Sequence, residues 1–288
     1  MLRRAAPAAA FLAPAAIGLL VFRLWPVLAA LDNSAYDVNL ISDRRSYVGL
    51  NNYWRATTDS GLWTSVRNTL VFTLVKVPLQ TALALALALL VNRAGRAILV
   101  VRTAVFLPVV TSLVVASTLW LLLLQPDQGL INGMLSTFGL PRQPFLRDVA
   151  QALPTLIAMT TWKDVGLSML FFLAGLQSIP EIYYEAARID GAGAWQRFLN
   201  VTLPLVRGTM LFVLVTETVF ALRVFAPIYV MTQGGPRQST SVIVFYIYEQ
   251  AFPLNSVGYA SALSVLLLVF IVLVTAVLRK VVGPRIAY

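Results

Sequence analysis

Residues 257–277 read VGYASALSVLLLVFIVLVTAV, and this uncharged stretch is followed at once by Leu278, Arg279 and Lys280. A helix needs about 20 consecutive, mostly apolar residues to cross the hydrocarbon core of a bilayer. The stretch therefore predicts a transmembrane helix. Because Lys and Arg beside a span are retained in the cytoplasm, the basic pair predicts that the end of this helix faces the cytosol.

Six segments of the chain meet the same criterion of length and composition, namely residues 8–31, 68–91, 103–124, 153–176, 208–230 and 257–277. The second, third and sixth are the clearest. A signal peptide is the alternative for the first, since Arg3 and Arg4 precede it, but its apolar stretch is longer than a usual signal core and no small-x-small cleavage site follows. We predict an all-α membrane protein in which residues 1–288 form one domain with six transmembrane helices.

The composition agrees with a membrane protein and excludes much enzyme chemistry. Hydrophobic residues make up 59% of the chain and charged residues 12%, about half the charged fraction of soluble proteins. Without Cys or His, the chain has no disulfide, no thiol nucleophile and no histidine base, and we predict no metal site. A net charge of +10 would indicate nucleic-acid binding in a soluble protein, but here the basic residues flank apolar runs, so we expect no nucleic-acid partner.

The distribution of charge predicts the orientation of the spans. With the N-terminus inside, the inner segments hold eleven basic and three acidic residues, whereas the outer loops hold seven of each. This asymmetry predicts cytoplasmic termini and outer loops at about 32–67, 125–152 and 231–256. Val242–Phe252, in the third outer loop, is too short to span and predicts an interfacial or re-entrant helix. The inner basic residues are Arg3, Arg4, Arg93, Arg96, Arg102, Arg188, Arg197, Arg207, Arg279, Lys280 and Arg285.

The inner loop between the fourth and fifth spans reads GLQSIPEIYYEAARIDGAGAWQRFLNVTLP over residues 175–204. Pro180 should end the fourth span, because proline cannot continue the hydrogen-bond ladder of a helix. A short helix over residues 181–190 would place three residues on one apolar face, and Gly191 stands where a helix end favours a left-handed residue. The residues of that face are Ile182, Ala186 and Ile189.

One interpretation of this loop is an amphipathic helix that lies on the inner leaflet. Helices on lipid surfaces favour a polar face rich in Lys and Arg, whereas Glu181, Glu185 and Asp190 stand out on this one. An acidic face beside an anionic leaflet indicates a protein partner instead.

The loop resembles the signature of binding-protein-dependent ABC importer permeases, which is Glu-Ala-Ala, three residues, Gly, nine residues, Ile, one residue and Leu-Pro. This chain has Glu185-Ala186-Ala187, Gly191 and Leu203-Pro204 at those spacings, with Val201 in place of Ile as the one departure. Further segments resemble the carbohydrate-uptake branch: 48–53, 68–69, 106–108, 175–177, and 184–187 with 190–192, Trp195 and Phe198. Residues 232–236, 251–252 and 258–262 resemble the first permease subunit of the maltose and glycerol-3-phosphate type.

The resemblance implies a type I ABC importer permease fold in the bacterial inner membrane. The implied partners are a second permease subunit, a cytoplasmic ATPase dimer and an extracytoplasmic solute-binding protein. The chain has no Walker A sequence, so it is not expected to be an enzyme or to bind a cofactor, and ATP and Mg would lie on the ATPase. The loop 177–204 would couple to that ATPase through Glu181, Tyr184, Glu185, Ala186, Ala187, Asp190, Gly191, Leu203 and Pro204.

Charged residues inside the spans are candidates for the solute path, because each costs about 2.5–3.5 kcal/mol at a helix centre unless it faces protein or water. Lys76 is one of them. Glu217 and Arg223 are six residues apart, so they lie on different faces of an ideal helix and should not pair directly. The alternative for aromatic residues near span ends is an interfacial belt. The candidates for the path are Trp120, Trp162, Lys163, Asp164, Glu217, Arg223 and Tyr229.

The Gly234-Gly235-Pro236 segment is either an ordinary turn or a contact for the solute-binding protein. For the whole chain, the favoured function is import of a sugar or sugar-like solute. One alternative keeps this machinery for glycerol 3-phosphate or a glycerophosphodiester, which the basic residues in the spans fit slightly better. An ion-gradient-driven transporter would explain the spans but not the acidic inner loop, and a membrane enzyme would lack a visible nucleophile–base pair.

Overall fold

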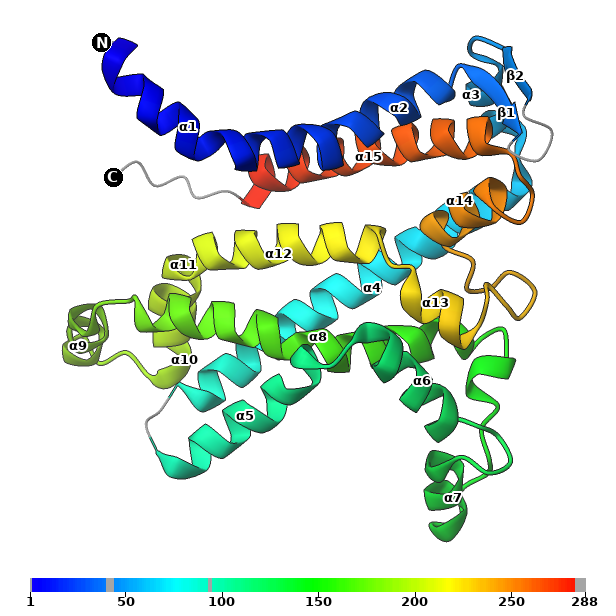
Figure 1. Cartoon of the computed structure of the whole chain (residues 1–288). Coiled ribbons are helices and arrows are strands. Elements are labelled where there is room, and N and C mark those ends of the chain that lie inside the picture. Colours follow the sequence, from blue (N-terminus) through cyan, green and yellow to red (C-terminus); the bar gives the residue numbers. More distant parts are fainter. Residues whose placement is uncertain (1, 40–43, 93–94, 283–288) are drawn as a thin grey trace. The chain divides into compact units, whose positions relative to one another are not determined.

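The computed structural model describes residues 2–39, 44–92 and 95–282, with side chains from residue 11 onward. The predicted inner charges Arg93 and Arg285 lie outside these residues, as do the side chains of Arg3 and Arg4. The elements, labelled in Figure 1, are α1 (Leu2–Leu19), η1 (Leu20–Leu24), α2 (Trp25–Asn33), β1 (Tyr36–Asn39), β2 (Arg44–Tyr47), α3 (Asn51–Thr58), α4 (Ser60–Val91), α5 (Arg96–Val110), α6 (Leu113–Leu123), α7 (Leu130–Thr137), η2 (Phe145–Arg147), α8 (Ala152–Gln177), α9 (Glu181–Ile189), α10 (Ala194–Arg197), η3 (Phe198–Thr202), α11 (Leu203–Leu205), α12 (Arg207–Leu222), α13 (Ala226–Met231), α14 (Ile243–Ala251) and α15 (Val257–Val282).

Within the described part of the chain, five stretches of helix are long and apolar enough to cross a membrane: Phe11–Asn33, Ser60–Val91, Ala152–Gln177, Arg207–Met231 and Val257–Val282. Each of them overlaps a predicted span. The second begins eight residues before the predicted Asn68, because Ser60 to Arg67 continue the helix outward. The short run near Val242 forms α14, a helix of nine residues that is too short to span.

The third predicted span, 103–124, is not one straight helix, contrary to its clear hydropathy. It is divided between α5 and α6, which meet at an angle of 100°, so it is either a broken span or a re-entrant loop. Thr111 and Ser112 adopt extended backbone with ψ of 139° and 135°, which turns the chain between the two helices. Hydropathy reports the composition of a segment and cannot report such a bend.

The fifth predicted span, 208–230, is also interrupted. Helix α12 ends at Leu222, residues 223–225 leave the helical conformation, and α13 resumes at Ala226 with Pro227 in its first turn. A proline is favourable there because the first turn of a helix leaves its N–H groups without an internal partner. The interruption leaves the backbone of residues 223–225 available to form the wall of a site.

The chain groups into two compact units, one of Met1–Leu62 with Tyr246–Phe270 and one of Trp63–Phe245 with Ile271–Tyr288. The structure is mostly helical, and the first unit adds a pair of short strands that the prediction of an all-α protein did not include. Strands β1 and β2 pair antiparallel from Tyr36 opposite Tyr47 to Asn39 opposite Arg44. The ring of Tyr36 contacts that of Tyr47 and lies under the guanidinium of Arg45, which explains why an aromatic and basic sequence forms strands here.

Asp59 organises the same unit. Its Oδ2 accepts hydrogen bonds from the hydroxyls of Tyr246 at 2.7 Å and Tyr259 at 2.6 Å, and its Oδ1 accepts the backbone N–H groups of Gly61 and Leu62 at the start of α4. Burial opposes the ionisation of Asp59, but these four hydrogen bonds outweigh it and lower its pKa below the usual value. Burial and the Asp59 carboxylate together raise the pKa of Tyr246, so this tyrosine stays protonated and remains a donor.

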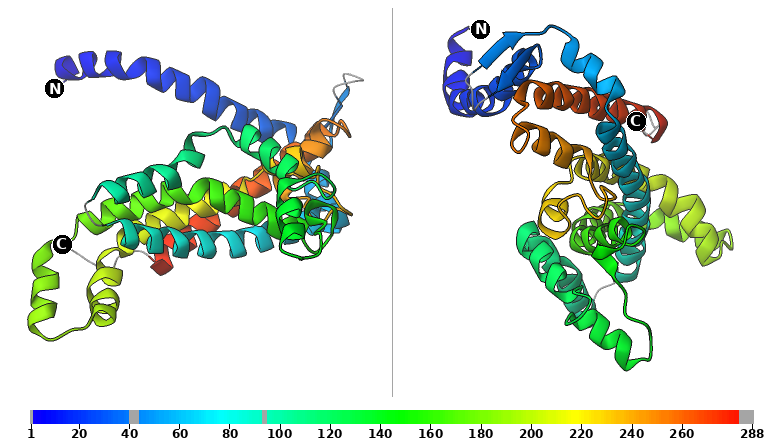
Figure 2. Two further views of the ribbon diagram at one scale, coloured as in Figure 1. Left: turned by 90° about the horizontal axis from the view of Figure 1, so that it is seen from below. Right: turned by 90° about the vertical axis from the view of Figure 1, so that its right-hand side faces the viewer.

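The second unit is built around α8, which packs against α5 on one side and α12 on another, while α6 packs against α13 (Figure 1). Two apolar clusters occupy its interior. The first cluster includes Phe72, Met159 and Ile228, and the second includes Ala84, Met169 and Val213. Figures 1 and 2 show α9 and α10 beyond one end of α8, and α7 and α13 at the other end. The inner loop and the second outer loop therefore lie at opposite ends of the same helix.

Candidate functional site

A row of polar side chains crosses α4, α8 and α12 between the two apolar clusters. We call it the polar belt and define it as Lys76, Gln80, Lys163, Asp164, Ser168 and Glu217. The ammonium of Lys76 donates to Glu217 Oε2 at 3.1 Å and to Asp164 Oδ2 at 3.3 Å. The side chains of Lys76 and Glu217 are each only 3% exposed, whereas that of Asp164 is 31% exposed. One buried cation thus holds a buried and an accessible carboxylate.

The rest of the belt satisfies the remaining polar atoms of these groups. Ser168 Oγ donates to Glu217 Oε1 at 2.7 Å, and Gln80 Nε2 donates to Ser168 Oγ at 3.2 Å. Lys163 Nζ lies 3.8 Å from Asp164 Oδ1 and donates to the carbonyl of Val109 at 3.3 Å. A cation at this carbonyl suits the negative end of α5, just before the bend. The two lysines and two carboxylates make the belt electrically neutral.

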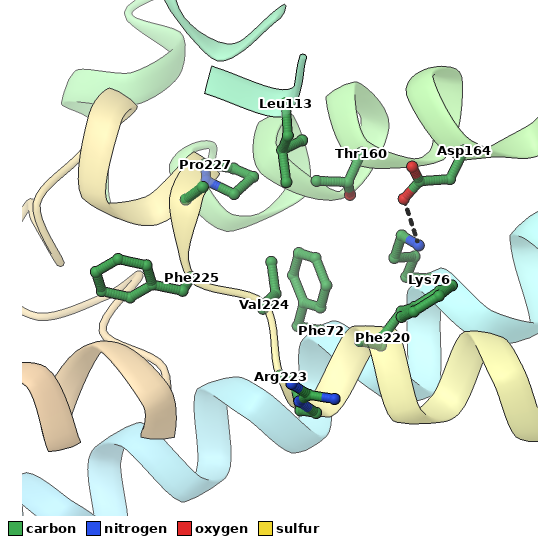
Figure 3. Close-up of a pocket in the computed structure, with 12 residues that line it drawn as sticks. Phe72, Lys76, Leu113, Thr160, Asp164, Phe220, Arg223, Val224, Phe225 and Pro227 are labelled. Atoms are coloured by element: carbon green, nitrogen blue, oxygen red, sulfur yellow. Dashed lines mark hydrogen bonds and ion pairs between the residues drawn. The ribbon is translucent and has the colours of Figure 1, made fainter. Parts of the chain in front are cut away.

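A cavity of about 460 Å³ opens beside the belt. Its walls include Lys76 and Asp164, the Thr160 hydroxyl, three aromatic rings and the interrupted part of the fifth span (Figure 3). Irregular backbone at membrane depth is tolerated only where it is buried in protein or lines an aqueous cavity, which accounts for its position here. The lining residues are Phe72, Lys76, Leu113, Thr160, Asp164, Phe220, Ala221, Arg223, Val224, Phe225, Ala226 and Pro227.

The structure brings together some of the residues predicted for the solute path and separates others. Asp164 and Arg223 line the cavity, and Lys163 and Glu217 belong to the belt behind it. Glu217 pairs with Lys76 rather than with Arg223, in agreement with their spacing on the helix. Trp120 and Trp162 contact each other with ring centroids 5.5 Å apart, and Tyr229 stacks on Phe225 at the cavity wall.

Sequence reasoning recognised Lys76 as a charge within a span, and so as a candidate for the path, but it could not identify the carboxylates that pair with it. Its two partners lie 88 and 141 residues away, so no local pattern could assign them. The rings of Phe72 and Phe220 were not anticipated either, because an apolar residue in an apolar span carries no distinguishing signal. The sequence did carry one signal: Gln80 lies one helical turn after Lys76, which predicts that this part of the helix has a polar face.

The inner loop has the predicted short helix, α9, followed by a left-handed turn. The N–H of Gly191 donates to the carbonyl of Arg188 at 3.1 Å, and the N–H of Ala192 donates to that of Ala187 at 2.9 Å. These two backbone hydrogen bonds are the pattern that ends a helix at a residue with positive φ, and Gly191 has a φ of 77°. The predicted position of the turn is confirmed.

The outward face of α9 is apolar and uncovered. Ile182 is 67% exposed and Ile189 is 86% exposed, and Glu185 and Ala186 are exposed beside them. Glu181 pairs with Arg188 at 2.8 Å on the surface, an exposed contact that contributes little stability. An uncovered apolar stripe with an acidic group at its side is the composition of a protein-binding surface.

The inward face of α9 attaches the loop to the helical bundle. The hydroxyls of Tyr184 and Thr202 lie 3.1 Å apart, and Ala187 is half-buried. Leu203 and Phe198 pack against the second apolar cluster. Of the predicted coupling residues, Tyr184, Ala187 and Leu203 therefore hold the loop, Gly191 forms its turn, and Glu181, Glu185, Ala186, Asp190 and Pro204 are exposed.

The Gly234-Gly235-Pro236 segment forms a turn with a clear structural reason for its glycine. Gly234 is buried with a φ of 80°, and a side chain there would meet the ring of Phe245. The hydroxyl of Thr240 donates to the carbonyl of Gly235 at 2.6 Å, and Asn68 Nδ2 donates to the carbonyl of Gln238 at 2.8 Å. The turn is thus fixed to α4, and it exposes Arg237 and Gln238 at its end.

The sequence model of the family described as "binding-protein-dependent transport system inner membrane component" matches residues 80–288. The sn-glycerol-3-phosphate transport system permease protein UgpA of Agrobacterium fabrum is 33% identical, over 96% of this chain and 94% of the relative. The trehalose/maltose transport system permease protein MalF of Thermococcus litoralis is 35% identical, over 91% of this chain and 89% of the relative.

A solved structure has a similar fold. It is the crystal structure of a bacterial alginate ABC transporter in complex with an alginate pentasaccharide-bound periplasmic protein. One of its chains is 26% identical to this one, with a TM-score of 0.86 over 97% of this chain and 94% of that chain.

Proposed function

The chain belongs to the family of binding-protein-dependent transport system inner membrane components, and from that premise we propose how its parts act in an ATP-driven importer. It is an inner-membrane permease subunit of the kind that serves sugar and glycerol-3-phosphate import, and it is not an enzyme, since the ATPase of such importers is a separate subunit. Membership of this family selects the ATP-driven importer over the gradient-driven transporter.

We propose that residues 1–288 form one permease domain with six spans and cytoplasmic termini, in which α5 and α6 together make the third span. The partners are a second permease subunit, an ATPase dimer that binds ATP and Mg, and an external solute-binding protein. The excess of basic residues on the inner side supports this orientation. The position of the inner loop and the second outer loop at opposite ends of α8 is compatible with it (Figure 1).

The exposed apolar face of α9 is the observation that carries the coupling role. In this proposal Ile182 and Ile189 are buried in a groove of the ATPase, and Glu185 forms a charge-assisted contact with an Arg or Lys there. Tyr184 and Leu203 transmit the movement to the bundle, because they join the loop to η3 and to the second apolar cluster. The solute crosses beside the polar belt, along the cavity of Asp164 and Arg223.

The other predicted site is the turn at Gly234, Gly235 and Pro236, which we propose contacts the solute-binding protein through the exposed Arg237 and Gln238. The solute is a sugar or sugar-like molecule, as the names of the relatives indicate for those proteins. Glycerol 3-phosphate or a glycerophosphodiester is the second candidate, and the guanidinium in the cavity favours it.

The coupling role is tested in the purified importer by the substitution Glu185→Lys, with Asp127→Lys as a control on an exposed acid of the second outer loop. Reversing a charge at a protein interface brings like charges together, so we expect ATPase binding to weaken at least about tenfold in Glu185→Lys and to stay unchanged in the control. Gly191→Pro should have the same effect, since proline cannot adopt a φ of 77°. Normal uptake and normal stimulated ATP hydrolysis in both loop variants would remove the coupling role from α9.

A further inference from the structure

The cavity beside the polar belt holds one positive charge that its own residues do not neutralise. Lys76 is matched by Glu217, and Lys163 by Asp164, so the belt is neutral. Arg223 also lines the cavity. Among the side chains described in residues 11–39, 44–92 and 95–282, no carboxylate forms an ion pair with its guanidinium.

A purely structural role for Arg223 would be to cap the end of α12, because cations are favourable at helix C-termini. At other helix ends, basic side chains do this directly. Arg102 Nε donates to the carbonyl of Val91 at 3.1 Å, and Arg207 Nε donates to that of Val282 at 2.9 Å. The Arg223 side chain makes no such bond within the described residues: only its backbone N–H bonds to the preceding turn, at the carbonyl of Phe220. Arg223 is exposed and is one of the residues that line the cavity (Figure 3).

A cation at membrane depth without a partner needs water or a ligand. The planar guanidinium offers paired N–H groups whose geometry matches the oxygens of a phosphate, carboxylate or sulfonate. The other walls supply the Asp164 carboxylate, which is 31% exposed, for hydroxyl groups, and the exposed ring of Phe220 for an apolar face, whereas Phe72 and Thr160 are buried. The cavity therefore suits a hydroxylated molecule that carries an anionic group.

We propose that Arg223 is a specificity-determining residue that binds an anionic oxygen group of the transported solute. The solute is then a sugar or polyol with a phosphate, carboxylate or sulfonate, and an uncharged sugar would leave the guanidinium unpaired. This inference rests on the proposed path of the solute through this subunit, and it assigns a specific role to Arg223 and a charge to the solute.

The test uses the complete importer in proteoliposomes, with its solute-binding protein and ATP. Probes are matched pairs that differ in one charged group: sn-glycerol 3-phosphate against glycerol, galacturonate against galactose, and sulfoquinovose, which carries a C6 sulfonate, against glucose. The variants are Arg223→Gln and Arg223→Lys, with Arg44→Gln on the exposed strand β2 as the control. The measured quantity is the number of solute molecules imported per ATP hydrolysed. A merely structural defect lowers import and hydrolysis together and leaves this ratio unchanged.

We expect the wild-type importer to accept the charged member of one pair, and the identity of that pair tells phosphate, carboxylate and sulfonate apart. Arg223→Gln should lower the ratio at least about tenfold, which corresponds to the free energy of one hydrogen bond to a charged group. Arg223→Lys keeps the positive charge and should lower the ratio less. Import of the neutral members alone, or an unchanged ratio in Arg223→Gln, overturns the role of Arg223 while ATP-driven import stands. Accumulation by the wild type without ATP would instead refute the proposed function itself.

Discussion

Lys76 is the residue on which the polar belt depends, because its ammonium is shared between Glu217 and Asp164. Removing one partner of a buried ion pair leaves the other charge uncompensated, which typically costs about 3–5 kcal/mol, whereas replacing both by apolar groups is often neutral. We therefore expect Lys76→Met to lower the melting temperature of the purified importer strongly, and Lys76→Met combined with Glu217→Leu to restore most of the loss. Lys280→Met, at the exposed end of α15, is the control. A single variant as stable as the double variant would show that Lys76 does not hold Glu217.

For these residues, the sequence predicts which side chains need a partner but not which partner each one has. The cost of a charge in a span singled out Lys76, Asp164 and Glu217 before any fold was known. Their pairing could not be predicted, since it depends on α4, α8 and α12 meeting at one depth. The loop residues behaved differently, because the turn at Gly191 follows from local backbone preference alone and was placed correctly.

Two glycines of α8 let neighbouring helices approach closely. A Cβ on Gly166 would meet the carbonyl oxygen of Val105 and lie 3.0 Å from the Cα of Phe106, and one on Gly175 would meet the side chain of Thr209. Small residues at such crossings allow the backbone contacts that hold membrane helices together. Gly208 in α12 is different, since a Cβ there meets nothing within 4 Å.

We expect Gly166→Ala to destabilise the bundle by about 1–3 kcal/mol, the usual cost of overpacking, because the backbone of α5 must move. The matched variant Gly208→Ala should be neutral or stabilising by a few tenths of a kcal/mol to about 1 kcal/mol, since it only restricts the unfolded chain. Thermal unfolding of the two purified variants measures the difference. Equal melting temperatures would mean that α5 and α8 do not cross at Gly166.

Among the elements, the helices of continuous hydropathy were predicted well and the breaks were not. Val257–Val282 starts at the predicted residue, and Ala152–Gln177 differs from the prediction by one residue at each end. The bend between α5 and α6 lies at Thr111 and Ser112, and the gap after α12 begins at Arg223. Single polar residues inside apolar segments do not by themselves predict a break, and a contact such as that of the Lys163 ammonium with the Val109 carbonyl beside the bend cannot be read from local sequence. The cavity, which both breaks help to line, was for that reason beyond sequence reasoning.

For the whole molecule, the bend between α5 and α6 decides the topology. If the pair crosses the membrane as one broken span, Thr58 and Gln128 are separated by two crossings and lie on the same side. If the pair is a re-entrant loop, one crossing separates them, and the inner loop with α9 moves to the outer side whenever the N-terminus is inside. The charge asymmetry favours the first arrangement, since it places the eleven inner basic residues together.

The chain contains no cysteine, so single cysteines can be introduced at Thr58, Gln128 and Ala194, three exposed positions in different loops. We expect a membrane-impermeant maleimide to label Thr58→Cys and Gln128→Cys in right-side-out vesicles, and Ala194→Cys only in inverted vesicles. The unmodified chain provides the background. Labelling of Gln128→Cys only in inverted vesicles would establish the re-entrant loop and place α9 outside. Helix α9 could then not contact a cytoplasmic ATPase, because the bilayer would separate its apolar face from that partner.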